Sequence, residues 1–284
     1  MQESEKSSWK EDWDKNDART FENLKDDDYS YQVLCMWSCF EFDTFIDIGP
    51  GIAFSEAWLL KRFDPTIQVI GFEPQSERFQ KLSHFCYPGR LFMNAVSDVD
   101  GIIVGGNGFR GGKSDFQINP TDQQVDRGEY AKAERISLTI DTIASQMIRQ
   151  NNTMFVWADV EGAEEQVLKG AVKSLSEGRI KGILLELHVQ KDKGGYFWKD
   201  ATAFLRQYGY KPVALFNIQP THFDCIFSSE PDQAIDNRIP DTSIQVIIDH
   251  NKDFVDGDLE MIRATRSFQC AKKMDQYLKF KEEK

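Results

Sequence analysis

Long hydrophobic runs and paired cysteines are both missing from this sequence. The longest apolar stretches are short, such as residues 33–37 (VLCMW), whereas a helix that spans a bilayer needs about 20 apolar residues. The first six residues are polar and acidic, unlike a secretory signal peptide. The five cysteines are scattered and odd in number, which fits neither a disulfide framework nor a zinc site. We therefore expect a cytoplasmic protein with no membrane segment.

Positive charge is also scarce. The chain has 34 lysine and arginine residues against 46 acidic ones, which gives a net charge of -12. No basic stripe is present, and an acidic surface repels a phosphate backbone, so we do not expect nucleic acid as a partner. The acidity lies mainly at the ends: residues 1–43 hold 12 acidic and 5 basic side chains, and residues 228–284 hold 12 and 9.

This charge distribution predicts three segments. An acidic, helical N-terminal extension covers residues 1–42, a nearly neutral domain covers 43–229, and a partly helical C-terminal extension covers 230–284. In the first extension, Trp9 and Trp13 are four residues apart and would share a helix face, either packed on the sheet or a partner subunit, or serving as a lid. A weak apolar stripe at Met274, Tyr277 and Leu278 could pair in a homodimer.

Two hydrophobic spacings alternate along the middle segment. Short continuous apolar runs, typical of buried strands, alternate with stretches that have apolar residues at helical spacing. Strands are predicted at 45–48, 69–72, 91–96, 154–158 and 182–188, helices at 54–63, 76–85, 164–175 and 197–208, and a closing antiparallel pair at 211–216 and 223–227. This order predicts a Rossmann-like α/β fold, with a mostly parallel seven-stranded sheet whose last strand is antiparallel and helices on both faces.

A glycine turn follows the first predicted strand. It reads Asp47-Ile48-Gly49-Pro50-Gly51, and Glu73 ends the next strand 22 residues after Gly51. Glycines let a backbone approach a ligand closely, and a carboxylate in this place accepts hydrogen bonds from both hydroxyls of a ribose. Dinucleotides and S-adenosylmethionine both use this arrangement; the alternative is a purely structural turn. The third glycine of the dinucleotide fingerprint falls on Phe54, so the pattern favours S-adenosylmethionine.

A second glycine-rich stretch, residues 105–112, precedes Lys113 and Ser114. It resembles a phosphate-binding loop, but its spacing is off by one residue and no helix start follows. We expect a loop at the rim of the sheet, which either covers the substrate or is a solvated connection.

Polar residues follow several predicted strands at their carboxyl ends, where parallel sheets bind ligands. Asn94 follows the third strand and either contacts an adenine or forms a turn. Asp159 ends the central strand and either approaches the methyl donor or caps the next helix. Glu186 and His188 are two residues apart on a strand and share a face. Because imidazole titrates near neutral pH, His188 is a candidate base; its alternative is a structural hydrogen-bonding role.

Seven short segments occur in the order found in one enzyme family. They are FIDIG at 45–49, VIGFEP at 69–74, NAVSD at 94–98 with Gly101, SLTID at 137–141, DVEGAE at 159–164, VLKGA at 167–171 and LLELH at 184–188. On these segments, residues 43–190 resemble FkbM-type methyltransferases, which are class I enzymes dependent on S-adenosylmethionine. Two positions depart from the family pattern: Ala53 stands at a usual glycine and Trp157 at a usual lysine.

The glycine turn, the strand ends and the resemblance together predict the site. S-adenosylmethionine is expected to bind at Asp47, Gly49, Gly51, Glu73, Asn94 and Asp159. The catalytic residues are expected to be His188, Glu161 and Asp159, and the acceptor is expected to lie at Glu186 and His188. Acidic side chains and His188 could converge on a divalent cation, but no spacing is diagnostic, so no metal is predicted.

The expected activity is O-methylation of a hydroxyl on a sugar, a glycan or another small natural product, as the resemblance implies. A methyltransferase fold that binds cofactor or partner without turnover is the alternative. A weaker alternative is an NAD-dependent oxidoreductase, against which Phe54 argues. The expected partner is therefore a small-molecule or glycan acceptor.

Overall fold

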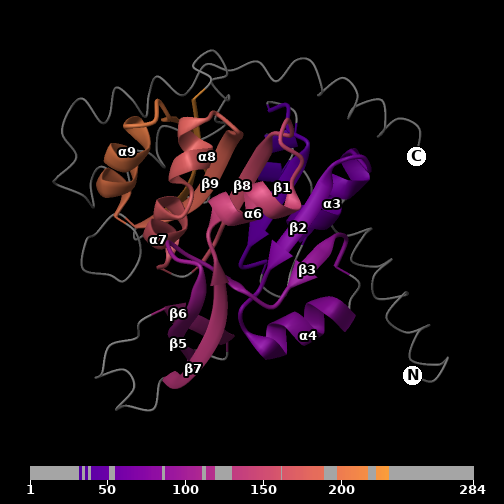
Figure 1. Ribbon diagram of the computed structural model, residues 1–284, viewed down its shortest axis with the longest axis vertical. Helices are drawn as coiled ribbons and strands as arrows, with labels where there is room; N and C mark the ends of the chain where they lie inside the picture. The colour runs from indigo at the N-terminus through magenta and orange to yellow at the C-terminus, as the bar shows by residue number, and fades with distance from the viewer. Residues whose placement is uncertain are drawn as a thin grey trace.

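The computed structural model of the chain describes residues 32–33, 36–37, 40–50, 55–84, 87–110, 113–118, 130–160, 162–188, 197–216 and 222–229. These residues form a seven-stranded sheet with helices on both faces and a second sheet of four strands (Figure 1). Within these ranges no helix is long and apolar enough to cross a bilayer. The predicted helix with Trp9 and Trp13 and the whole C-terminal extension lie outside them.

The main sheet follows the predicted alternation of strands and helices. In spatial order its strands are β10 (Lys211–Phe216), β11 (His222–Ser228), β9 (Ile180–His188), β8 (Met154–Ala158), β1 (Thr44–Ile48), β2 (Gln68–Phe72) and β3 (Arg90–Phe92). β1 pairs in parallel with β2 and β8, and β8 with β9, whereas β11 runs antiparallel to both of its neighbours. The predicted fold class, including the antiparallel last strand, is confirmed.

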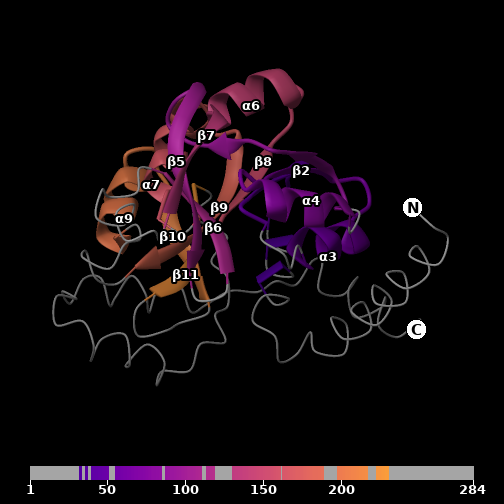
Figure 2. The same cartoon turned by 90° about the horizontal axis from the view of Figure 1, so that it is seen from below.

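Both faces of this sheet are buried, which explains the continuous apolar runs in the sequence. Neighbouring residues of a strand point to opposite faces, so Ile46 and Val156 enter one core while Phe45 and Trp157 enter the other. The first core is completed by α6 (Ile140–Met147), α7 (Glu164–Lys169), α8 (Val172–Ser176) and α9 (Trp198–Arg206). The second is completed by α3 (Ser55–Phe63), α4 (Ser76–His84), Val33, Met36, Trp37 and Phe40. Figure 2 shows α6 and α3 on opposite sides of the sheet.

The second sheet is the main departure from the predicted fold. Its order is β4 (Ala95–Val96), β7 (Tyr130–Leu138), β5 (Gly101–Arg110) and β6 (Lys113–Ile118). The single strand predicted at 91–96 is wrong, because β3 belongs to the main sheet and β4 pairs with β7. The loop predicted at 105–112 is also wrong, because β5 and β6 form a hairpin and β5 pairs with β7 on its other edge. Pairing along both edges overrides the weak strand preference of glycine.

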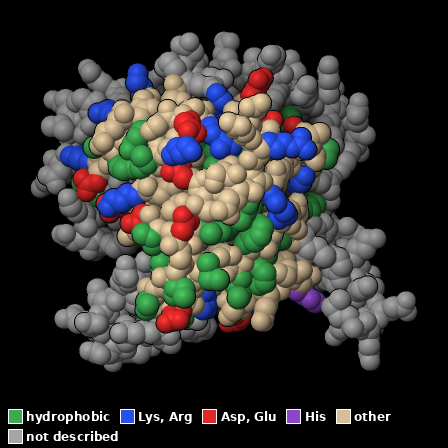
Figure 3. Space-filling model, in the orientation of Figure 1, with side chains coloured by type: hydrophobic (Ala, Val, Ile, Leu, Met, Phe, Trp, Pro, Cys, Tyr) green, Lys and Arg blue, Asp and Glu red, His purple; other side chains and the backbone are tan. Residues whose placement is uncertain are grey.

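One face of this second sheet is apolar and exposed. Ile102 of β5 and Ile136 of β7 are register partners, and their side chains are 72% and 59% exposed. Val99 and Val104 are exposed nearby, and Figure 3 shows apolar side chains gathered where this sheet lies. Ser137, the next residue along β7, is buried. In the described part of β5 and β7, the face that carries Ile102 and Ile136 is therefore exposed, whereas the face that carries Ser137 is buried.

The helix predicted at 164–175 is two helices, α7 and α8, which meet at Gly170 and Ala171. A Cβ at position 170 would meet the backbone oxygen of Ser97 at a distance that real Cβ atoms do not adopt. The carbonyl of Gly170 in turn accepts a hydrogen bond from the N–H of Asp141, 2.9 Å away. Three of the motif segments, around residues 97, 141 and 170, therefore meet at one point of the fold.

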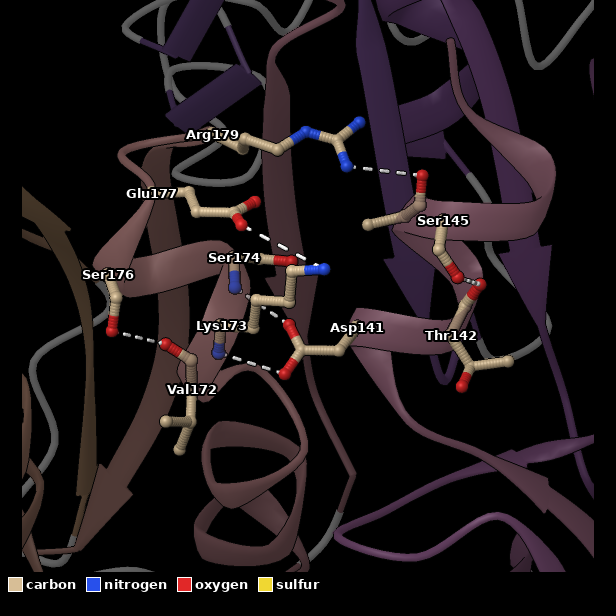
Figure 4. A network of polar contacts seen from close by, with 10 residues as sticks. Asp141, Thr142, Ser145, Val172, Lys173, Ser174, Ser176, Glu177 and Arg179 are labelled. Atoms are coloured by element: carbon tan, nitrogen blue, oxygen red, sulfur yellow. Dashed lines mark hydrogen bonds and ion pairs between the residues drawn. The ribbon is translucent and has the colours of Figure 1, made fainter. Parts of the chain in front are cut away.

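Asp141 connects α6 to the first turn of α8 (Figure 4). Its carboxylate accepts hydrogen bonds from the backbone N–H groups of Lys173, at 2.9 Å, and Ser174, at 2.7 Å. These N–H groups have no partner within their own helix, because the first turn of a helix lacks preceding carbonyls. Asp141 thus serves as the side-chain cap of α8, although it lies on another helix.

Replacing Asp141 by alanine should lower the free energy of unfolding by about 1–2 kcal/mol, the usual cost of losing a helix cap. The matched control is Glu177→Ala, which removes only an exposed ion pair with Lys173 of 3.9 Å and should change stability by less than about 0.5 kcal/mol. Urea denaturation of both variants measures the difference. Equal midpoints for the two variants would show that Asp141 does not stabilise the junction.

Candidate functional site

The order of the strands locates the site. From β1 the chain builds outward to β2 and β3, and it then returns to place β8 on the other side of β1. In such a sheet, ligands bind beyond the carboxyl ends of the strands at the point where this direction reverses. That point lies between β1 and β8, and the residues that follow these strands are Gly49 and Asp159.

Gly49 is held tightly between its neighbours. Its φ of 79° lies in the left-handed region, its N–H donates to the carbonyl of Phe72, 2.9 Å away, and the N–H of Asp159 donates to the carbonyl of Ile48, 3.1 Å away. A Cβ on Gly49 would overlap the backbone oxygen of Asp159. Both the conformation and the space therefore require glycine here. Gly51, the second glycine of the predicted turn, lies outside the described residues.

Glu73 follows β2 and is only 2% exposed. Its Oε1 accepts a hydrogen bond from the N–H of Gln75, 2.8 Å away, whereas its Oε2 is buried and has no hydrogen-bond partner among the described residues. Burial raises the pKa of Glu73 to about 7, against the opposing effects of the Gln75 N–H and of Arg78. A hydrogen bond from Arg135 of the second sheet to the carbonyl of Pro74 holds the turn that follows β2.

Asp47 lies in β1, is 1% exposed, and is close enough to Glu56 of α3 to feel its charge. The hydroxyl of Tyr87 donates to its Oδ2 over 2.6 Å. Burial, followed by the negative charge of Glu56, raises the pKa of Asp47 well above its ordinary value. Tyr87 occupies the space next to Gly71, where a Cβ would lie 2.6 Å from its ring. Sequence reasoning missed Tyr87; the signal was Gly71, since glycine within a buried strand indicates that another group approaches closely.

The segment after β8 carries the next group of predicted residues. Asp159 is half-buried, and the alternative that it caps the next helix is wrong, because the N-cap of α7 is Ala163. Glu161 lies outside the described residues. Glu164 was not predicted: its Oε1 accepts from the N–H of Gly162 over 3.1 Å, and its buried Oε2 has no hydrogen-bond partner among the described residues. Burial raises the pKa of Glu164 to about 7.

Glu186 and His188 lie on one face of β9, as predicted, with Glu186 Oε1 and His188 Nε2 3.4 Å apart. Across the antiparallel pairing, His222 of β11 stands opposite His188 with ring centroids 6.0 Å apart, and the buried Asp224 stands opposite Glu186. We call these four residues the β9–β11 cluster. His222 and Asp224 were missed, because only the pairing of two strands distant in sequence brings them to the site.

A family model decides the classification. The model described as "Methyltransferase FkbM domain" matches residues 47–212, which is more than half of the chain. The chain belongs to the FkbM methyltransferase family. This confirms the resemblance found in the motif segments, and S-adenosylmethionine is the cofactor of this FkbM methyltransferase. A search of curated proteins finds no match to the sequence.

Solved structures give distant similarities. A TehB-like SAM-dependent methyltransferase from Corynebacterium glutamicum is 11% identical with a TM-score of 0.38, and the match covers 75% of this chain and 96% of the other. A precorrin-6y C5,15-methyltransferase from Geobacter metallireducens is 14% identical with a TM-score of 0.38, and the match covers 72% of this chain and 90% of the other. The O-methyltransferase of a trans-AT polyketide synthase from Brevibacillus brevis is 11% identical with a TM-score of 0.36, and the match covers 83% of this chain and 68% of the other. The family assignment depends on the family model alone.

The described residues of the FkbM methyltransferase fit its cofactor. The buried Oε2 of Glu73 is an acceptor that has no donor within the described residues, as a group that binds ribose hydroxyls requires. Gly49 presents backbone without a side chain at the switch point. Among His, Cys, Asp and Glu side chains of the described ranges, no group of three is arranged to hold a metal ion.

The structure shows the contacts of Asn94 and Trp157. Asn94 lies between β3 and β4, and its Nδ2 donates to the carbonyl of Ile136 over 3.2 Å, so its amide links the two sheets. An adenine contact of Asn94 stays a prediction. Trp157, where the family usually has lysine, is 3% exposed. It packs edge-on against Phe45 with ring centroids 6.3 Å apart. The indole therefore belongs to the core on the α3 face.

Gly49→Ala should weaken binding of S-adenosylhomocysteine about tenfold or more, because the methyl group would push β1 and β8 apart. Gly209→Ala is the matched control: its φ of 83° creates the same backbone strain, but nothing lies within 4 Å of the added carbon. Titration calorimetry measures both affinities, and the control should stay within about twofold of the parent protein. Equal losses of affinity in the two variants would show that the close approach of Gly49 to Asp159 does not contribute to cofactor binding.

Cofactor affinity should depend on pH through Glu73, whose pKa is about 7. The ionised carboxylate accepts charge-assisted hydrogen bonds from hydroxyls, and these weaken by roughly 1–2 kcal/mol when it is protonated. We expect the affinity for S-adenosylhomocysteine to fall about tenfold from pH ~8 to pH ~6. In Glu73→Gln the affinity should be low and nearly independent of pH; a slope as steep as the parent's would assign the titration to another group.

The stability of the cofactor-free protein should depend on pH in the opposite direction to the cofactor affinity. A carboxylate whose pKa is raised in the folded state favours folding most below its unfolded pKa of 4.5, and this contribution is lost as the pH rises through about 7. Thermal stability of the cofactor-free protein should therefore decline over that range, and less so in Glu73→Gln. Thermal denaturation at several pH values measures the difference between the two proteins; equal declines would contradict the raised pKa.

Proposed function

We propose that this FkbM methyltransferase methylates a hydroxyl oxygen of a sugar, a glycan or another small natural product. The observation that carries the proposal is the Glu186–His188 pair, whose atoms lie 3.4 Å apart at the carboxyl end of β9. A hydroxyl acceptor must lose its proton to become a good nucleophile, and an imidazole held by a carboxylate can take that proton.

When bound, S-adenosylmethionine would supply a methyl group activated by its sulfonium charge and would leave as S-adenosylhomocysteine. The chain's own contribution is to align the acceptor and to accept its proton. In this proposal His188 receives the hydroxyl proton at an imidazole nitrogen, Glu186 orients the ring, and the oxygen forms its new bond to the methyl carbon. Asp159 and Glu161, after β8, retain their predicted catalytic roles, and Asp159 also its predicted contact with the cofactor.

The remaining parts of the proposal concern the surroundings of the enzyme. They are a cytoplasmic location, a small-molecule or glycan acceptor rather than nucleic acid or a membrane, and a homodimer. The division into segments 1–42, 43–229 and 230–284 belongs to the same proposal. An oxidoreductase does not agree with the family assignment, and a protein that binds cofactor without turnover is the alternative that the assay below tests.

Transfer of a labelled methyl group from S-adenosylmethionine to a panel of methyl glycosides, free sugars and phenols should give an O-methylated product. His188→Ala should lower kcat by about 100-fold or more and leave the affinity for S-adenosylhomocysteine unchanged. His84→Ala, on the exposed surface of α4, is the control and should keep full activity. A product methylated on nitrogen or carbon, or full activity in His188→Ala, would contradict the proposal.

A further inference from the structure

Gln32 links the N-terminal extension to the last strand of the sheet. It is fully buried, with an exposed fraction of 0%, and its Nε2 donates to Oδ2 of Asp224 over 2.8 Å, across 192 residues of sequence. Val33, Met36, Trp37 and Phe40, which follow it, are part of the core on the α3 face of the sheet. The extension therefore has a fixed attachment point beside the β9–β11 cluster.

The other atom of the Gln32 amide is unsatisfied. Its Oε1 is buried and has no hydrogen-bond partner among the described residues. Leaving a buried acceptor without a donor costs about 1–3 kcal/mol, so a side chain chosen only for packing would not be an amide. An acceptor oxygen in this place is suited to a ligand that brings a hydrogen-bond donor, such as a hydroxyl.

Asp224 lies on the strand that pairs with the strand of the candidate base. It stands opposite Glu186 in the pairing of β11 with β9, and it is two residues from His222, so both side chains lie on the same face of β11. His222 in turn stands opposite His188.

Three carboxylates belong to the surroundings of the candidate base. Glu186 of β9 has its Oε1 3.4 Å from Nε2 of His188, Asp224 of β11 stands opposite Glu186 in the strand pairing, and Glu164 of α7 interacts electrostatically with Glu186. The hydrogen bond from Gln32 acts on one of these three carboxylates.

We propose that Gln32 is a positioning residue for the acceptor side of the site. Its amide donor fixes the Asp224 carboxylate on β11, and through Asp224 it makes the β9–β11 cluster a single acid–base unit that receives the hydroxyl of the acceptor. This inference rests on the proposed function, because it assigns the cluster to the acceptor. It gives the segment before β1 a part in the chemistry, in addition to its packing.

The proposal has a measurable electrostatic consequence. A hydrogen-bond donor stabilises an ionised carboxylate, and an ionised carboxylate stabilises a protonated imidazole close to it. When the donor is removed, the buried Asp224 should bind a proton more readily, and a positive charge on His188 should lose part of its support. Loss of Gln32 should therefore change the pKa of His188, although it is Asp224 that Gln32 contacts.

The test follows the histidines by NMR. The full chain has four histidines, and a pH titration of the protein labelled in histidine gives the pKa of each, with the exposed His84 as internal reference. Asp224→Asn should lower the pKa of His188 by about half a unit or more. Gln32→Met, which keeps the size but removes the amide, should lower the same pKa, and should add nothing when Asp224→Asn is already present.

A further variant is the control for the loss of an amide. Gln207→Ala removes an exposed amide that donates to the carbonyl of Ala203 and should leave the pKa of His188 unchanged. A pKa of His188 in folded Gln32→Met that equals that of the parent protein would overturn the proposal.

Binding of S-adenosylhomocysteine distinguishes this inference from the proposed function. All variants should bind it with the parent's affinity, because Glu73 and Gly49 lie at other strands. If the parent protein fails in the methyl-transfer assay while His188 responds as described, the proposed function fails and the cluster stands. If transfer occurs and His188 does not respond, the inference about Gln32 fails alone.

Discussion

The close contact between the turn after β1 and the backbone that follows β8 is the constraint on which the site depends. Gly49 is bonded to the end of β2, the end of β1 is bonded to Asp159, and no side chain fits between Gly49 and Asp159. Three strands are thereby held together at the point where the topology reverses. The positions of Glu73 and Asp159 therefore follow from backbone packing, which is stiffer than contacts between surface side chains.

Unsatisfied buried acceptors are the second property of the site. Glu73 Oε2, Glu164 Oε2 and Gln32 Oε1 are all buried and have no hydrogen-bond donor among the described residues. Each lowers the stability of the free protein, and each is suited to a ligand that carries donors. We expect the first to bind the ribose of the cofactor, and we propose that the third meets the hydroxyl of the acceptor. Both assignments would explain why these acceptors are kept at some cost in stability.

Much of the main sheet could be predicted because its strands are short apolar runs separated by turns. The spacing of Gly49 and Glu73 was informative for the same reason, since both end strands that the pattern identifies. The second sheet could not be predicted, because the glycine-rich β5 has weak local preferences and is held by pairing with β6 and β7. Tyr87, His222 and Asp224 enter the site through contacts between distant segments, for which hydrophobic periodicity gives no signal.

The bond between Gln32 and Asp224 also affects the order in which the chain acquires its structure. A ribosome delivers residue 32 long before residue 224, and a contact that spans 192 residues closes a loop containing almost the entire sheet. Gln32 therefore meets its hydrogen-bond partner only after β11 has been synthesised and paired. The strands β1, β2 and β8 can pair earlier, whereas the β9–β11 cluster is completed by the first and last described segments together.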